Sequence, residues 1–346
     1  MTFQELLGTA LPIIQAPMAG SQGHAMAAAV CNAGGLGSLP SALLSAEGLR
    51  SELSALRSQT RAPFNLNFFC HVPPTPDAHR EAEWRATLAP YYEEYGVDPA
   101  SIAAGPGRMP FNTETVPLVE EFRPAIVSFH FGLPSADLLA RVRAIGARVL
   151  SSATTVEEAL WLEAHGVDAI IAQGLEAGGH RGHFLSHDLT IQPGTFALLP
   201  QIVRAVHLPV IAAGGIADYQ TMKAALALGA TAVQVGTAYL TCPEATTSKV
   251  YRAALSSPAA QHTALTNLFT GRPARGIVNR VMRELGPMSE KPPPFPLATS
   301  AILPLRAKAE AQGSGDFSPL WAGENVSGCK PIPAADLTRE LADVGS

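Results

Sequence analysis

The chain has 346 residues, of which 47% are hydrophobic and 15% are charged, and its 24 basic and 29 acidic residues give a formal charge of −5. This composition is typical of a folded globular protein and excludes a disordered chain. This net negative charge does not predict the basic surface that binding to nucleic acid requires.

The cysteines and the N-terminus predict a cytoplasmic protein. Cys31, Cys70, Cys242 and Cys329 lie far apart without a Cys-x-x-Cys pair, so neither a disulfide scaffold nor a zinc ribbon is expected. Residues 1–5 include no basic region before an apolar run, and nowhere do 18 apolar residues follow one another. We therefore expect neither a secretory signal, nor a membrane-spanning helix, nor a membrane partner.

Short apolar runs recur along the chain, and each ends in Gly, Pro or a small residue. They are continuous rather than alternating, which is typical of strands that are covered on both faces of a parallel sheet. The predicted strands are residues 12–18, 35–40, 64–69, 125–131, 149–153, 168–173, 210–214 and 232–236.

Amphipathic stretches of helical length separate these runs. Plausible N-caps are Ser135, Thr155 (or Thr154 beside it) and Asp218. Eight strands alternating with helices predict a (β/α)8 TIM barrel, with an open doubly wound sheet as the alternative. The predicted helices span residues 24–32, 47–57, 136–144, 155–165, 195–206 and 219–228.

Two segments interrupt the alternation, and both are predicted to pack over one face of the barrel. Residues 73–124 hold an acidic, aromatic helix and a Gly/Pro-rich piece, and residues 241–321 hold helices and a proline run. We expect residues 1–240 with 330–346 to form the barrel and residues 241–329 to form a C-terminal helical cap on the substrate side. The two parts are expected to form one continuous unit.

Glycine turns follow the last two predicted strands. Gly214 and Gly215 end one strand, and Gly236 and Thr237 end the next. Backbone N–H groups in such turns can approach an anion, and barrels often bind phosphate there. Tight βα turns alone would also explain single glycines, but both turns at adjacent strand ends favour a phosphate site. No Walker loop and no Gly-x-Gly-x-x-Gly opening a βαβ unit is present.

The loop after the sixth strand, residues 173–182, carries the most reactive side chains. Gly178 and Gly179 let the backbone approach a flat ligand, Gln173 offers an amide, and His180 can act as a base or pair with an anion. His180, His183 and His187 have a metal-like spacing, but the glycines oppose a helix, so no metal is expected. His130, at the end of the fourth strand, either faces the barrel mouth or lies in the core.

These pieces together resemble the nitronate monooxygenase family, FMN-dependent TIM barrels. The segments that carry the resemblance are residues 15–20, 27–37, 128–132, 173–182, 213–216, 234–238, 271–277 and 320–323. Residues 128–134, 271–277 and 320–323 resemble the branch that acts on alkyl nitronates such as propionate 3-nitronate. The chain departs from the family pattern at residues 21–26 and at Phe295, where a tyrosine is frequent.

The resemblance implies a role for individual residues. His180 would be the catalytic histidine, and Gly20 and His130 would lie on the substrate side. The residues implied to bind FMN are Pro17 and Met18 against the flavin ring, Asn67, Gln173, Gly178 and Gly179 beside it, and Gly214, Gly215, Gln234, Val235, Gly236 and Thr237 at the phosphate end.

The implied activity is the oxidation of an alkyl nitronate by O2 to a carbonyl compound and nitrite, with FMN as cofactor. The partners would be the nitronate and O2, and the protein would be a monomer or homodimer. The alternatives are an NAD(P)H-dependent flavin reductase of quinones or enoyl thioesters on the same scaffold, and a non-catalytic FMN-binding protein.

Overall fold

The computed structural model describes residues 1–102 and 107–343. Its main sheet has eight parallel strands in the order β1-β9-β8-β6-β5-β4-β3-β2. A parallel bridge between Ile14 and Leu36 joins the two ends of this order and closes the sheet into a barrel. The strands are β1 (Ile13–Gln15), β2 (Ser38–Pro40), β3 (Asn65–Phe69), β4 (Ile126–His130), β5 (Arg148–Ala153), β6 (Ala169–Gln173), β8 (Val210–Ala213) and β9 (Ala232–Val235). All eight predicted strands are present, and the predicted barrel is confirmed, rather than the open sheet.

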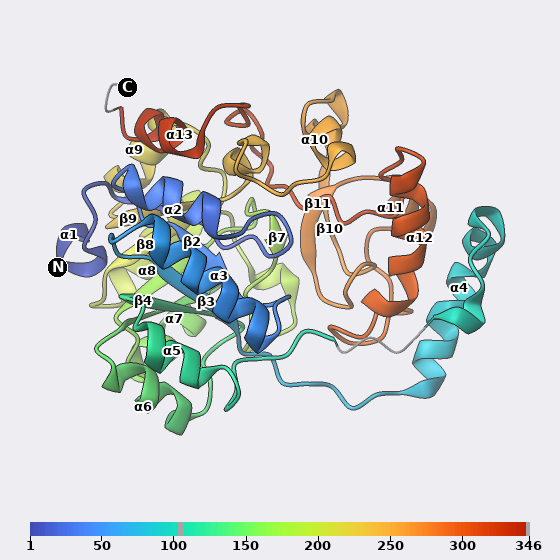
Figure 1. The fold of residues 1–346 in the computed structure, drawn as a ribbon, viewed down its shortest axis with the longest axis horizontal. Helices are drawn as coiled ribbons and strands as arrows, with labels where there is room; N and C mark the ends of the chain where they lie inside the picture. The colour runs from blue at the N-terminus through green and yellow to red at the C-terminus, as the bar shows by residue number, and fades with distance from the viewer. Residues whose placement is uncertain (103–106, 344–346) are drawn as a thin grey trace.

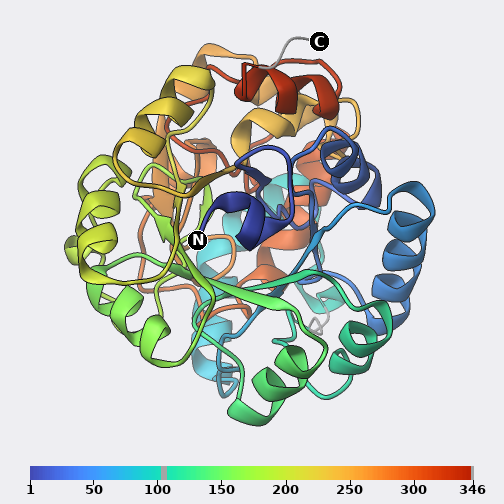
Figure 2. The same ribbon diagram turned by 90° about the vertical axis from the view of Figure 1, so that its left-hand side faces the viewer.

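Helices surround the barrel and alternate with its strands (Figure 2). The Thr155 hydroxyl accepts from the Glu158 amide, and Asp218 forms a reciprocal cap with Thr221, so both predicted caps are confirmed. Ser135 occupies the N-cap position of its helix without a capping bond from its side chain. The surrounding helices are α2 (His24–Asn32), α3 (Ala46–Gln59), α5 (Val116–Phe122), α6 (Ala136–Ala144), α7 (Val156–Ala164), α8 (Thr195–Ala205), α9 (Tyr219–Ala227) and α13 (Ala334–Leu341).

The strands bury both of their faces, which explains their continuous apolar sequences. In β8, Val210 and Ala212 belong to the cluster between the barrel and its helices, whereas Ile211 and Ala213 belong to a second cluster inside the barrel. Helix α1 (Phe3–Leu7) adds Leu6 and Leu7 to the inner cluster. It lies across one opening of the barrel (Figures 1 and 2), so a ligand reaches the interior from the other end.

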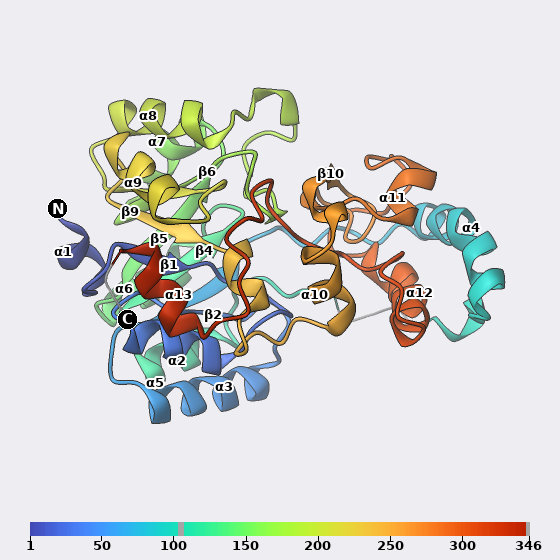
Figure 3. The same cartoon turned by 90° about the horizontal axis from the view of Figure 1, so that it is seen from above.

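A cap lies beyond the carboxyl ends of the strands (Figures 1 and 3). Two distant stretches of chain build it, because Trp84 Nε1 donates to the Ala298 carbonyl at 3.2 Å and the Tyr92 hydroxyl donates to the Ala301 carbonyl at 2.7 Å. The inserted segment and the C-terminal segment therefore share one apolar cluster. The cap helices are α4 (Ala78–Tyr95), α10 (Lys249–Leu255), α11 (Arg280–Leu285) and α12 (Thr299–Ala311).

The cap also contains strands, which the sequence did not predict. β10 (Thr263–Thr266) and β11 (Ala274–Ile277) are antiparallel, and β7 (Gly179–His180) pairs with β11. These strands have only two to four residues, so neither alternation nor a long apolar run marks them. The pairing sets Ala274 opposite His180, and it thereby ties the loop after β6 to the cap.

No helix in residues 1–102 and 107–343 is long and apolar enough to cross a membrane.

Candidate active site

A pocket of about 1300 Å³, counting the part open to solvent, lies between the carboxyl ends of the barrel strands and the cap. Thirteen of the residues predicted from the sequence line it: Pro17, Met18, Asn67, His130, Gln173, Gly178, Gly179, His180, Gly214, Gly215, Gln234, Gly236 and Thr237. The position at strand carboxyl ends is the one at which TIM barrels place their active sites.

Two predicted residues do not line the pocket. Gly20 is exposed and lies in a turn, with φ of +85°, in which the Ser21 amide donates to the Met18 carbonyl. Val235 is 1% exposed and packs outward against the helices, because successive side chains of a strand alternate and Gln234 takes the inward position. The main-chain carbonyl of Val235 accepts from the amide of Ala16, a pocket residue, at 2.8 Å.

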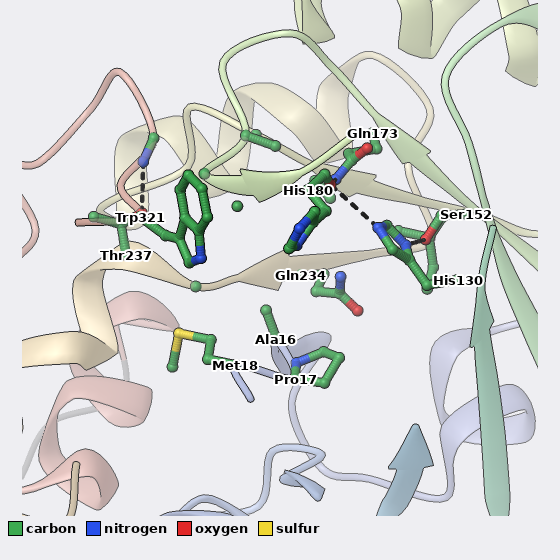
Figure 4. A pocket seen from close by; sticks show the side chains of 18 of the residues that line it. Ala16, Pro17, Met18, His130, Ser152, Gln173, His180, Gln234, Thr237 and Trp321 are labelled. Carbon is green, nitrogen blue, oxygen red and sulfur yellow. Dashed lines mark hydrogen bonds between the residues drawn. The ribbon is translucent and has the colours of Figure 1, made fainter. Parts of the chain in front are cut away.

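The pocket contains a slot with side chains on two opposite sides (Figure 4). His180 and Trp321 lie on one side of it, and Ala16, Pro17 and Met18 lie on the other. The ring centroids of His180 and Trp321 are 5.5 Å apart. The two rings are tilted by 58° to each other, and the opposite wall is apolar.

One end of the slot is formed by the two glycine turns. Gly214 and Gly215 have φ of +118° and +74°, a region that favours glycine, and a Cβ at Gly214 would meet Thr195 Oγ1 at 2.7 Å. Residues 322–325, here called the strap, cover the turns. The Gly323 amide donates to Thr237 Oγ1 at 3.0 Å, and Asn325 Nδ2 donates to the Gly215 carbonyl at 3.1 Å. Residues 320–323 carry part of the family resemblance, but nothing in the sequence predicted that this segment covers the glycine turns.

His180 lies at the other end, in a largely aromatic environment. Its ring centroid is 5.3 Å from that of Phe295, 6.1 Å from Phe131 and 6.2 Å from Phe69. Its Nε2 is 2.9 Å from Thr270 Oγ1, and that hydroxyl also lies 3.3 Å from the Arg272 carbonyl, which can only accept. When Thr270 donates to this carbonyl it accepts from Nε2–H, and Nδ1 of His180 keeps its lone pair for a ligand.

The loop that carries His180 is held by polar side chains at the ends of neighbouring strands. Gln173 Nε2 donates to the His180 carbonyl at 2.9 Å, and Gln173 Oε1 accepts from the Gly182 amide at 2.7 Å. Arg181, which is fully buried, donates to Gln192 and to the carbonyls of Gly174 and Gln173. The predicted amide of Gln173 thus reaches the pocket wall, but both of its polar atoms also hold the loop backbone.

Burial and nearby cations keep the histidines of the site neutral. Burial lowers the pKa of His180 well below its usual value, and the positive charge of Arg108 lowers it further. Burial is also the main reason that the pKa of His130 falls to about 3. At neutral pH, His180 is therefore a neutral imidazole that can accept a hydrogen bond or a proton without carrying a charge beforehand.

The residues present fit a flavin. Gln234 Oε1 is buried without a hydrogen-bond partner among the described residues, so it awaits a donor such as a ring N–H. Gly178 lies so close to the strap that a Cβ there would meet the Gly323 amide nitrogen at 2.5 Å. The glycine turns offer main-chain N–H groups to a phosphate, and Arg108 is the only Lys or Arg among the described residues that line the pocket.

Comparison with known proteins agrees with this geometry. The sequence profile of the family described as nitronate monooxygenase matches residues 2–343. The chain is 46% identical to a nitronate monooxygenase from Paraburkholderia phytofirmans, with 97% of this chain and 92% of the relative covered. It is 44% identical to one from Pseudomonas aeruginosa, with 99% and 98% covered.

A solved structure extends the likeness to three dimensions. The nitroalkane oxidase from Streptomyces ansochromogenes superimposes with a TM-score of 0.89 at 38% identity, and the match covers 99% of this chain and 98% of that one. The family implies a flavin cofactor. With the profile matching almost the whole chain and relatives well above 40% identity, this protein belongs to the nitronate monooxygenase family of flavin-dependent oxidoreductases.

Proposed function

We propose that this protein is an FMN-dependent nitronate monooxygenase that oxidises alkyl nitronates, such as propionate 3-nitronate, with O2 to a carbonyl compound and nitrite. The observation that carries the proposal is the slot between the neutral His180 and the Pro17–Met18 wall, which ends in the glycine turns after β8 and β9. Membership of the family supports the same activity.

The cofactor would be held by main-chain groups and short side chains rather than by cations. The turns at Gly214–Gly215 and Gly236–Thr237 would hold the phosphate, and Asn67, Gln173, Gly178 and Gln234 would lie beside the ring. FMN, when bound, supplies the capacity to pass electrons from the substrate to O2. The chain itself orients the ring and excludes water from it through the cap.

His180 would act on the substrate through its ring. With its hydrogen on Nε2, the neutral imidazole can take the proton from carbon at Nδ1 when a neutral nitroalkane binds. In the other tautomer, Nε2 would accept from Thr270 and Nδ1–H would donate to a nitronate oxygen. Thr270 fixes the ring at Nε2, and the pairing of β7 with β11 fixes the main chain of His180. These contacts orient the ring before the substrate binds.

The test is O2 consumption and nitrite release by the purified, FMN-loaded protein with ethyl nitronate and propionate 3-nitronate. His180→Asn should retain FMN but lose activity by about 100-fold or more. His165→Asn is the matched control, since that exposed imidazole stacks on Trp161 at 3.7 Å, outside the pocket. Full activity in His180→Asn would contradict its role. Rapid anaerobic bleaching of the flavin by NADH, without nitronate oxidation, would instead indicate the flavin reductase.

A further inference from the structure

Arg108 is the one cation among the described residues that line the pocket. It belongs to the inserted segment between α4 and α5, and no motif in the sequence singles it out. Its Nη1 donates to Thr299 Oγ1 at 3.2 Å, and its guanidinium carbon lies 5.6 Å from the ring centroid of Phe295. Both contacts are made to the cap, so the fold holds the guanidinium at the mouth of the site.

Among the described residues, no carboxylate is paired with the charge of Arg108. The one hydroxyl partner leaves most of its N–H donors free. Burial lowers the pKa of Arg108 only to about 10, so the group is charged at neutral pH. A partly buried cation is costly unless an anion pairs with it, so the missing anion is expected to come from a ligand.

The other arginines near His180 donate hydrogen bonds to the protein, although Arg272 Nε has no partner among the described residues. Arg181 donates to two carbonyls and to Gln192, and Arg272 donates to the His183 carbonyl while its guanidinium lies 4.0 Å from the ring centroid of Phe131. Neither of them lines the pocket. Arg108 is thus the cation that faces the ligand.

Arg108 also lies at the end of the pocket opposite to the phosphate turns. Its neighbour Phe295 is 5.3 Å from His180, whereas the phosphate turns are covered by Gly323 and Asn325. After burial, the positive charge of Arg108 is the largest cause that lowers the pKa of His180. An anion paired with Arg108 would therefore be the substrate and not the cofactor phosphate.

We propose that Arg108 is a specificity-determining residue that binds an anionic oxygen pair of the substrate, either the nitronate group itself or a carboxylate elsewhere on the same molecule. The inference rests on the proposed function. In this arrangement Arg108 supplies the positive charge, and His180 lies near it as an uncharged ring. The site thereby selects ionised substrates over neutral nitroalkanes.

The first test compares Arg108→Met and Arg108→Lys with the wild-type protein, all loaded with FMN. Arg108→Met should lower kcat/KM for ionised nitronates by about 10- to 100-fold, mainly through KM, and Arg108→Lys should recover part of the loss. Arg306→Met is the control, because the Arg306 charge is already paired with Glu310 at 2.8 Å. Thermal unfolding of each variant checks that it folds.

The choice of substrates identifies the group that is bound. An equal loss with ethyl nitronate and propionate 3-nitronate assigns Arg108 to the nitronate, and a loss with propionate 3-nitronate alone assigns it to the carboxylate. Unchanged kcat/KM for both substrates in a folded Arg108→Met protein would overturn the proposal. Because the cation also depresses the pKa of His180, the acid limb of the pH profile should move to higher pH in Arg108→Met and stay in place in Arg306→Met.

A binding experiment tests Arg108 without turnover. Propionate should raise the Tm of the flavin-loaded wild-type protein more than the neutral propionamide does, and Arg108→Met should abolish the difference. Equal responses to the two compounds in the wild-type protein would overturn the proposal. If the wild-type protein oxidises neither nitronate, the proposed function fails, whereas the comparison of propionate with propionamide still decides whether Arg108 binds an anion.

Discussion

His130 Nε2 lies 3.1 Å from the main-chain carbonyl oxygen of His180, and His130 Nδ1 lies 3.0 Å from the Ser152 hydroxyl. A carbonyl only accepts, so Nε2 carries the hydrogen and Nδ1 accepts from Ser152. His130 therefore bridges β4, β5 and β7, and it shares the His180 carbonyl with Gln173 (Figure 4). The ring lines the pocket, as predicted, but its nitrogen atoms position the main chain that carries His180.

Replacing His130 with Phe should lower kcat by about 10-fold while FMN stays bound, because one of two donors to the His180 carbonyl is lost. The free energy of unfolding should fall by about 1–3 kcal/mol, since Ser152 loses its partner. Denaturant unfolding and O2 uptake measure the two effects. Adding Ser152→Ala should restore part of the stability but not the rate. An unchanged kcat in His130→Phe would show that the bridge does not position His180.

Gln234→Leu should separate the stability of the apoprotein from its affinity for flavin. The unpartnered Oε1 of Gln234 is a cost in the apoprotein, so its removal should leave the free energy of unfolding unchanged or raise it by about 1 kcal/mol. The Kd for FMN should rise by about 10- to 100-fold, measured by quenching of flavin fluorescence. Gln201→Ala, on the exposed face of α8, is the control for the titration. A loss of apoprotein stability together with unchanged FMN affinity would refute this assignment.

Gly178→Ala should destabilise the protein by about 1–3 kcal/mol and weaken retention of the flavin. Its Cβ would meet main-chain atoms of the strap, Gly323 N at 2.5 Å and Ala322 C at 2.7 Å, which cannot rotate away. Gly48→Ala in α3 is the matched control and should stabilise by about 0.5–1 kcal/mol, since its nearest atom is at 3.4 Å. Thermal unfolding and the flavin content after gel filtration measure both effects. Equal Tm values for the two variants would contradict the close contact.

Acidification should destabilise the protein partly through His183, which is 1% exposed and has no partner for its ring nitrogens among the described residues. Burial lowers the pKa of His183 to about 3, whereas an unfolded histidine titrates near 6.5. At pH values between about 3 and 6.5, this histidine binds a proton in the unfolded chain but not in the folded protein. Stability should therefore fall as the pH falls, with a slope of up to about 1.4 kcal/mol per pH unit for this one residue.

The variant His183→Leu should reduce this slope and leave the stability at pH 7 unchanged or slightly higher, as urea unfolding between pH 5 and 7 would measure. His79→Gln is the control, because the His79 side chain is 82% exposed in the folded protein. A slope as steep in His183→Leu as in the wild-type protein would contradict the role of burial.

The sequence by itself determined the barrel and the end of the pocket that the glycine turns form. Each strand is a local apolar run, and the turns at Gly214–Gly215 and Gly236–Thr237 follow directly from their places at strand ends. His180 was predicted at the pocket for the same reason. Such features depend on residues that are neighbours in the chain, so local patterning is enough to predict them.

Only the tertiary structure decided how the polar atoms of the site are used. Arg108 reaches the pocket because an insertion packs on α12, and the strap at Gly323 and Asn325 reaches the turns from far along the chain. Packing also leaves Gln234 Oε1 without a hydrogen-bond partner among the described residues, whereas both polar atoms of the Gln173 side chain have one. The hydrogen-bond partners of a buried polar group come from distant segments that meet only when the core forms. No local pattern in the sequence predicts these contacts.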